Sequence, residues 1–191
     1  TNPVPLTVAE FAPAAQEYAI VFAGADDAVV PVVILGAEKD QNLYVDEQGA
    51  WKARYVPAFV RRYPFVFAQS EDGRTLTLCI DESFSGCNRD GRGERLFDAE
   101  GERTAYLQQV LEFQRAYQTQ HQRTEAFCRR LVELDLLQPV QAQLRSAGGP
   151  ARVLGGLKVV DRSRLKALDP EVLQQLLRSD ELELIYLQLH S

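Results

Sequence analysis

The sequence predicts an α+β fold, with an antiparallel-rich sheet in the N-terminal half and amphipathic helices in the C-terminal half. Up to about residue 101, short β-branched or aromatic runs are separated by glycine and aspartate turns, which is the pattern of strands. Beyond that point, apolar residues recur every three or four positions, as on one face of a helix. Because strands precede and follow the helices instead of alternating with them, α+β is favoured over a parallel α/β fold.

The length of the chain predicts one domain. A chain of 191 residues buries a sizeable core without disulfides or structural metals. We therefore expect a single domain over residues 1–191, with a β-rich sub-half of about 1–101 and a helix-rich sub-half of about 102–191.

The first elements are short strands. Residues 17–24 and 29–36 are β-branched or aromatic runs that each end on a glycine, and both predict a strand. A shorter strand is expected at 43–45, followed by an Asp-Glu-Gln-Gly turn. Pro57 is suited to the start of a single helical turn over 57–62.

A hairpin and a long loop complete the first half. Strand 65–69 is expected to lead through a turn containing Asp72-Gly73 into strand 74–81, because Asp-Gly between alternating apolar residues favours a hairpin. The polar, glycine-rich stretch 85–102 is expected to be a loop, with a short strand at 95–97.

The second half predicts a helical hairpin and then a mixed strand-helix-helix-strand part. Apolar stripes over 104–118 and 124–137 indicate two amphipathic helices joined by a short polar link. A Gly-Gly-Pro break at 148–150 precedes a strand at 153–160. Two short helices follow, the second with Pro170 in its first turn, and the last expected element is a strand over 182–190.

Composition and charge limit the classes of partner. The net charge of −6 repels polyphosphate, so we expect no nucleic acid partner. No apolar run approaches the ~20 residues of a membrane span. Three cysteines without a Cys-x-x-Cys spacing favour free thiols in a reducing compartment, and a Cys79–Cys87 bridge across the hairpin is the alternative. We expect neither a cofactor nor a metal.

One segment reverses the sign of the chain. Residues 48–70 contain no Asp or Glu but four Lys or Arg, and six of the seventeen aromatic residues lie between Trp51 and Phe67. Guanidinium groups recognise carboxylates in a bidentate manner, and aromatic rings stack on sugars or peptide bonds. A recognition site for an acidic peptide or a glycan is therefore one interpretation. Its candidate residues are Trp51, Arg54, Arg61, Arg62 and Tyr63.

The same segment also has a purely structural interpretation. Tyr63, Phe65 and Phe67 alternate along a strand, so their rings are suited to fill a core. Arg61 or Arg62 is then expected to pair with Asp81 or Glu82 on the neighbouring strand. Both interpretations stay open on the sequence alone.

Six stretches of the chain carry a family resemblance: EYAIVF, NLYVDEQGAW, YVPAFVRRYPF, LCIDES, RLFDAEGERT and TEAFCRRLVELDLLQP. They resemble the bacterial SapC family, which is named for a protein associated with a paracrystalline surface layer. They follow one another in the same order along nearly the whole chain, and the block at 55–65 is the most specific of them. Ala19 departs from the pattern, since a proline is expected there after the tyrosine. The resemblance implies a surface-layer or cell-envelope connection and carries over no catalytic residue.

The acidic loop at 81–101 is the other candidate region. Its oxygen-rich side chains do not have calcium-hand spacing, because Arg92 and Ala99 occupy the fifth and twelfth positions counted from Asn88. A nucleophilic site would need Ser83, Ser85 or Cys87 to meet His121, and no local signature such as Gly-x-Ser-x-Gly supports it.

These observations favour a non-enzymatic binding or assembly protein of bacteria. The alternative is a hydrolase or tailoring enzyme, or an accessory subunit of one, with a site that joins Asp81, Cys87 and His121. A cytoplasmic location is expected, with the cell envelope or export as the alternative.

Overall fold

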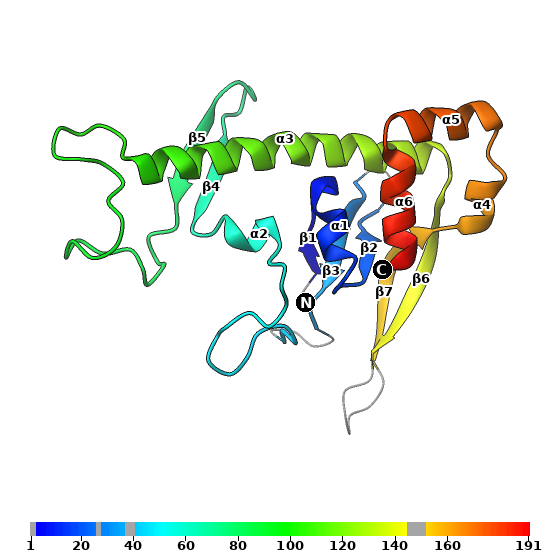
Figure 1. Ribbon diagram of the computed structural model, residues 1–191, viewed down its shortest axis with the longest axis horizontal. Helices are drawn as coiled ribbons and strands as arrows, with labels where there is room; N and C mark the ends of the chain where they lie inside the picture. Colours follow the sequence, from blue (N-terminus) through cyan, green and yellow to red (C-terminus); the bar gives the residue numbers. More distant parts are fainter. Residues whose placement is uncertain (1–2, 26–27, 37–40, 145–151) are drawn as a thin grey trace. The chain divides into compact units, whose positions relative to one another are not determined.

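The computed structural model describes residues 3–25, 28–36, 41–144 and 152–191. It confirms the α+β class and divides the chain into two compact units (Figure 1). Unit 1 comprises Thr1–Ala58 and Gln120–Ser191, and unit 2 comprises Phe59–Thr119. Unit 2 is thus inserted into the sequence of unit 1, so the two units do not coincide with the expected sub-halves 1–101 and 102–191.

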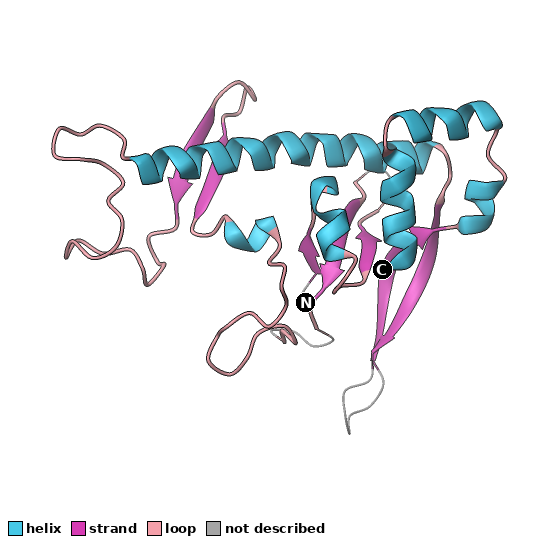
Figure 2. Cartoon of the chain, in the orientation of Figure 1, coloured by secondary structure: helices cyan, strands magenta, loops and turns pink. Residues whose placement is uncertain are grey.

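Unit 1 is built on a five-stranded antiparallel sheet in the order β1-β3-β2-β7-β6. The strands expected within 17–24, 29–36 and 153–160 are all confirmed in it. The two C-terminal strands form a long hairpin, which Figure 2 shows in magenta. The strands are β1 (Pro3–Pro5), β2 (Ile20–Ala23), β3 (Val30–Ile34), β6 (Leu137–Leu144) and β7 (Arg152–Val160).

Strand β6 was not expected. The prediction ended a helix at 137 because of Pro139, but the chain enters a strand there instead. β6 occupies one edge of the sheet, where a proline costs no ladder hydrogen bond on its open side. The expected Gly-Gly-Pro break at 148–150 lies outside the described residues.

Short helices and the second half of a long helix complete the main core of unit 1. This core is aliphatic and aromatic, and Phe11, Phe22, Val33, Leu131 and Ile185 are fully buried in it. The helical segments of unit 1 are η1 (Val8–Glu10), α1 (Phe11–Ala14), α4 (Arg162–Lys166), α5 (Pro170–Arg178) and α6 (Glu181–His190). Pro170 opens α5 as expected, and Asp169 caps that helix by accepting from the Glu171 N–H.

The predicted helical hairpin is wrong, because α3 (Ala105–Glu133) is one continuous helix of 29 residues. The expected link at 119–123 contains neither Gly nor Pro, so nothing in it ends a helix. Thr119 and Thr124 keep helical backbone and donate their hydroxyls to the carbonyls of Arg115 and Gln120. None of the described helices has the length and apolar character needed to span a bilayer.

The predicted C-terminal strand at 182–190 is also wrong, because this segment forms α6. The alternation of Glu and Leu at its start indicated a strand. However, Leu184, Ile185 and Gln188 are the buried residues, and their spacing is that of one helical face. Gln188 donates to the Ile20 carbonyl and accepts from the Val160 N–H, which fixes α6 to strands β2 and β7.

Unit 2 contains a two-stranded antiparallel hairpin of β4 (Phe65–Gln69) and β5 (Leu76–Ile80), together with the first half of α3. The hairpin expected between 65 and 81 is confirmed. The helical turn expected after Pro57 is confirmed as α2 (Ala58–Arg61), at the boundary of the two units. The strands expected at 43–45 and 95–97 are reduced to single bridges, between Val45 and Trp51 and between Phe97 and Arg103.

Candidate functional site

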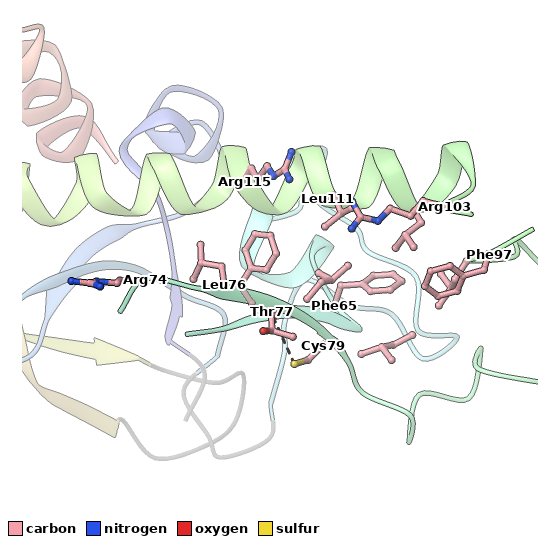
Figure 3. A pocket seen from close by; sticks show the side chains of 14 residues that line it. Phe65, Arg74, Leu76, Thr77, Cys79, Phe97, Arg103, Leu111 and Arg115 are labelled. Carbon is pink, nitrogen blue, oxygen red and sulfur yellow. Dashed lines mark hydrogen bonds between the residues drawn. The ribbon is translucent and has the colours of Figure 1, made fainter. Parts of the chain in front are cut away.

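A groove of about 700 Å³ lies in unit 2, between the β4–β5 hairpin and the first half of α3 (Figure 3). Its volume is in the range of ligand-binding pockets. One wall is the hairpin and the other is α3, and Leu96 and Phe97 of the long loop also line it.

The hairpin turn holds the first wall in register. The Ser70 N–H donates to the Thr75 carbonyl at 3.0 Å, and the Ser70 hydroxyl donates to the Asp72 carboxylate at 2.6 Å. Gly73 has a φ of 71°, a conformation that favours glycine. The Asp-Gly turn therefore fixes which residues of β4 and β5 lie opposite each other.

That register gathers apolar side chains on one face of the hairpin. Residues directly opposite in an antiparallel pair share a face, and Phe65 lies opposite Ile80, as Phe67 lies opposite Leu78. The Phe65 ring packs edge-on against Tyr106 of α3 at 6.3 Å between centroids. This apolar face therefore looks toward α3 and forms the floor of the groove.

The α3 wall follows a four-residue spacing. Arg103, Leu107, Leu111 and Arg115 all line the groove, and each lies four positions after the one before. Leu107, Leu111 and Arg115 share one face of α3, whereas Arg103 lies two residues before the helix begins, in the bridge with Phe97. The two leucines therefore form an apolar centre with Arg115 on one side and Arg103 on the other. In Figure 3, Leu111 lies between Arg115 on one side and Arg103 on the other.

The charge of the groove has one sign. Arg74, Arg103 and Arg115 line it, and none of the described residues that line it is acidic. All three arginines are exposed to solvent. Guanidinium groups bind carboxylates through paired N–H donors, so the groove is suited to an anionic ligand with an apolar centre.

The predicted recognition residues Arg61 and Arg62 stack on aromatic rings of unit 2. The guanidinium carbon of Arg62 lies 4.4 Å from the centroid of Phe59 and 4.9 Å from that of Tyr117. Arg61 lies over Phe113 at 5.2 Å. These contacts tie the α2 segment to α3, which favours the structural interpretation of both residues.

Tyr63, another predicted recognition residue, is half exposed and contacts the start of the loop after β5. Its hydroxyl donates to Asp81 at 3.1 Å, and its ring packs edge-on against Phe84. Asp81 also accepts from the Ser83 hydroxyl at 2.6 Å. Hydrogen bonds from Ser83 and then Tyr63 lower the pKa of Asp81, whereas partial desolvation and the Asp81 contact raise the pKa of Tyr63.

Trp51 belongs to a hydrogen-bonded aromatic cluster in unit 1. Its indole N–H donates to the Tyr18 hydroxyl at 2.9 Å, and Tyr18 donates in turn to the Tyr55 carbonyl. The Tyr44 hydroxyl donates to the Glu17 carbonyl at 3.1 Å. Burial raises the pKa of Tyr18 and of Tyr44. The cluster holds the 44–55 segment against the core, which again favours the structural interpretation.

Arg54 is a strongly exposed member of the predicted recognition residues, with 93% of its side chain accessible. Its guanidinium lies 3.7 Å from the Glu17 carboxylate, which also accepts from the backbone N–H groups of Arg54 and Tyr55. The five predicted residues are divided between the units: Trp51 and Arg54 belong to unit 1, and Arg61, Arg62 and Tyr63 to unit 2.

A buried carboxylate completes the anchoring of this segment. Glu10 is 4% exposed and accepts from the Tyr55 hydroxyl at 2.8 Å and the Ala58 N–H at 2.6 Å. Its other oxygen accepts from the N–H and the hydroxyl of Thr7. Glu10 is not among the residues that the sequence predicts for a site, although the Thr-x-x-Glu spacing at 7–10 is that of a capping box.

The loop after β5 lines a second hollow of unit 2, of about 550 Å³. Cys87 and Arg92 line it, and Arg92 pairs with Asp90 at 3.3 Å. Cys79 and Cys87 are both free thiols, as expected. No group of three or more His, Cys, Asp or Glu side chains suited to a metal occurs among the residues that the structure describes.

The alternative catalytic site is not assembled within either unit. Asp81 and Cys87 belong to unit 2, whereas both histidines of the chain, His121 and His190, belong to unit 1. His121 lies 3.5 Å from Glu125, one turn further along α3. The joining of Asp81, Cys87 and His121 therefore stays a hypothesis.

The arginines of the groove are not among the five residues that the sequence predicts for a site. Arg74 lies in the expected strand 74–81, Arg103 between the expected loop and helix, and Arg115 on the polar side of that helix. The signal that was present is the four-residue repeat from Arg103 to Arg115. It becomes informative only when the β4–β5 hairpin is known to face that stripe.

A comparison with family models extends these observations. The model of the SapC family matches residues 1–191, which is the whole chain. No curated protein and no solved structure matches the chain.

Proposed function

The chain belongs to the SapC family, and we propose that it is a non-enzymatic binding or assembly protein that recognises an acidic segment of a partner macromolecule, a peptide or a glycan. The groove of unit 2 is the proposed binding site. Its arginines hold the acidic groups of the partner, and its apolar floor holds the less polar part.

The observation that carries this proposal is the combination of charge and shape in the groove. Three arginines surround an apolar floor in a protein whose net charge is −6. General repulsion of anions by the whole chain is overcome only where basic groups are concentrated. The groove is such a place within unit 2, and its about 700 Å³ leaves room for several residues or sugar units.

Binding fits the groove better than catalysis does. A general base or nucleophile needs a partner group within hydrogen-bond reach. The groove is lined by arginines, Thr77, Cys79 and apolar side chains, and none of the described lining residues is a histidine or a carboxylate. Electrostatic attraction and apolar contact are what these side chains provide.

The basic-aromatic segment takes a supporting part in this proposal. Arg61 and Arg62 stack on Phe113, Phe59 and Tyr117, and Tyr117 and Phe113 belong to the same helix as the groove leucines. Leu111 and Phe113 are two positions apart, so they point to nearly opposite sides of α3. The segment therefore holds α3 from the side that the groove does not use.

The setting of this function is part of the proposal. The surface-layer or cell-envelope connection expected from the resemblance would supply acidic protein segments or glycans as partners. A cytoplasmic location, with export as the alternative, stays a proposal beside it.

Two defined arrays test the proposal, one of short acidic peptides and one of anionic glycans. Labelled wild-type protein is expected to bind members of one array, more weakly as salt is raised, because the contacts are ionic. The Arg103→Ala/Arg115→Ala variant is expected to lose this binding by at least about tenfold. The matched control is Arg54→Ala, which removes an exposed arginine of unit 1.

The proposal fails on two outcomes. One is that folded wild-type protein binds neither array above the level of an unrelated acidic protein. The other is that the groove variant and the Arg54→Ala control bind equally well, since binding would then not involve the groove.

A further inference from the structure

The two outer edges of the β4–β5 hairpin differ in their hydrogen bonding. The Asp81 N–H donates to the Pro64 carbonyl at 2.9 Å, and the Ser70 N–H donates to the Thr75 carbonyl at 3.0 Å. Every second pair of an antiparallel ladder is hydrogen-bonded. In the observed register, Thr77 and Cys79 therefore direct their backbone groups toward β4. Leu76, Leu78 and Ile80 direct theirs away from it.

The outer edge of β4 contacts α3 at the first residue of the strand. Gln114 is 2% exposed, and its side-chain amide donates to the Phe65 carbonyl at 2.9 Å, on the side away from β5. This contact confirms the alternation, because Phe65 lies opposite Ile80 in a pair that is not hydrogen-bonded.

The outer edge of β5 is open. Among the residues that the structure describes, none forms a hydrogen bond with the outward backbone groups of Leu76, Leu78 and Ile80. All five residues of β5 line the groove, so this edge opens into it. An open strand edge is a template for another strand, and strand addition is an established way of binding extended peptides.

We infer that unit 2 binds its partner by strand addition: an extended polypeptide segment with an aliphatic centre and a carboxylate at each end pairs with the outer edge of β5. Its alternate side chains enter the groove. This inference rests on the proposed function, because it places the ligand in the same groove, and it selects a polypeptide over a glycan.

The length of the groove sets the pattern of the segment. Leu107, Leu111 and Arg115 follow one another at steps of roughly 6 Å along α3, and Arg103 lies two residues before the helix begins. Alternate side chains of an extended chain follow one another at steps of roughly 7 Å. Side chains one, three, five and seven of such a segment face α3. The first and last are acidic and meet the arginines, and the two between are aliphatic and meet Leu107 and Leu111.

Capped heptapeptides provide the probes. The sequence ETITITE places Glu at the ends and Ile in the middle of the α3-facing set, whereas TIETEIT has the same composition in another order. ETITITE is expected to bind to wild-type protein at least about tenfold more tightly than TIETEIT. Only one edge of the peptide pairs with β5, so only every second N–H of the peptide donates to the strand. N-methylation of those residues is expected to abolish binding, whereas N-methylation of the residues between them is not.

Hydrogen exchange followed by NMR reports the pairing directly. On addition of ETITITE, the amides of Leu76, Leu78 and Ile80 are expected to become protected, whereas Thr77 and Cys79 are protected already. Leu78→Pro removes one outward N–H and is expected to weaken binding more than Leu78→Ala, which removes the side chain but keeps the N–H. Circular dichroism establishes that both variants are folded.

The outcomes separate this inference from the proposed function. If ETITITE binds without protecting Leu76, Leu78 and Ile80, strand addition is wrong while the groove stands. If ETITITE does not bind at millimolar concentration, the inference is wrong, and the arrays still decide the proposed function. A stable dimer in light scattering with the same three amides protected would show that a second copy occupies the edge, which also overturns it.

Discussion

Gln114 donates its side-chain amide to the carbonyl oxygen of Phe65 at 2.9 Å and, more weakly, to that of Arg62 at 3.3 Å. One buried side chain of α3 thus satisfies the backbone at the start of β4. The contact fixes the start of β4 to α3, whereas the outer edge of β5 opens into the groove.

Replacing Gln114 by leucine tests this anchoring. The change keeps the approximate volume but removes the donor, so the Phe65 carbonyl loses its partner in a buried place. The Arg62 carbonyl loses a weaker bond and still accepts from the Phe65 N–H at 2.8 Å. The free energy of unfolding is expected to fall by about 1–3 kcal/mol in urea titrations. Gln109→Leu, on the exposed side of the same helix, is the matched control and is expected to change it by less than about 0.5 kcal/mol. Equal effects of the two changes would contradict the anchoring role.

Arg62 is expected to matter for stability and Arg54 is not. Arg62→Ala removes a guanidinium stacked on two rings and is expected to cost about 1–2 kcal/mol of the free energy of unfolding. Arg54→Ala removes an exposed ion pair with Glu17 and is expected to cost at most about 1 kcal/mol. Denaturant unfolding of both variants checks the order, and a larger loss for Arg54→Ala would refute it.

Glu10 is expected to be the most sensitive polar residue of unit 1. Both oxygens of the Glu10 carboxylate accept hydrogen bonds, from donors of Thr7, Tyr55 and Ala58. Glu10→Gln replaces one of these oxygens by an NH₂ group, which cannot accept from the donors that it faces. A loss of about 3 kcal/mol is expected, against about 1 kcal/mol for Tyr55→Phe, which removes a single donor. Thermal unfolding followed by circular dichroism measures both. A Glu10→Gln variant with unchanged stability would show that the carboxylate does not hold this segment.

The three cysteines are expected to differ in reactivity. Burial raises the pKa of Cys128 to about 12, so almost none of it is thiolate at pH 8. Cys79 and Cys87 are half-buried free thiols. Titration of the folded protein with a chromogenic disulfide at pH 8 is expected to modify those two, and Cys128 only after unfolding. Rapid modification of all three thiols would contradict the burial of Cys128.

The Asp81 carboxylate gives a prediction about pH. Hydrogen bonds from Ser83 and Tyr63 lower its pKa from the ordinary value of 3.8. A lowered folded-state pKa contributes stability that is present above 3.8 and is lost as the pH falls through the folded value. In NMR titrations, Ser83→Ala is expected to move the pKa of Asp81 back toward 3.8. An unchanged pKa would show that Ser83 does not stabilise the charged form.

The hairpin and the helix caps were predictable because their signals are local. Asp72-Gly73 specifies a turn within four residues, and Pro170 specifies the start of α5. The single helix α3 was missed because a run of glutamines around His121 was interpreted as a link, although it contains no residue that ends a helix. The alternation of Glu and Leu predicts a strand at 182–190, but the buried residues Leu184, Ile185 and Gln188 have the spacing of a helical face.

The groove could not be predicted from the sequence because it depends on tertiary pairing. Its walls come from β5 and α3, which are separated in sequence by the long loop at 81–104. The sequence instead favours a site among the clustered aromatic residues at 51–65. In the structure, Trp51 donates a hydrogen bond to Tyr18 and Arg62 stacks on Phe59, and both contacts hold the fold together. In a sequence, density of arginine and aromatic residues does not distinguish a buried anchor from a binding surface.

A charge exchange across the groove tests the central claim most directly. Calorimetric titration compares wild-type protein with the Arg103→Glu/Arg115→Glu variant, each against the heptapeptides ETITITE and KTITITK. We predict that wild-type protein prefers the glutamate-ended peptide and that the variant prefers the lysine-ended one, by at least about tenfold in each case. The arginines of the groove do not recognise an anionic partner if each protein binds the two peptides equally. The same conclusion holds if the variant prefers the same peptide as the wild-type protein.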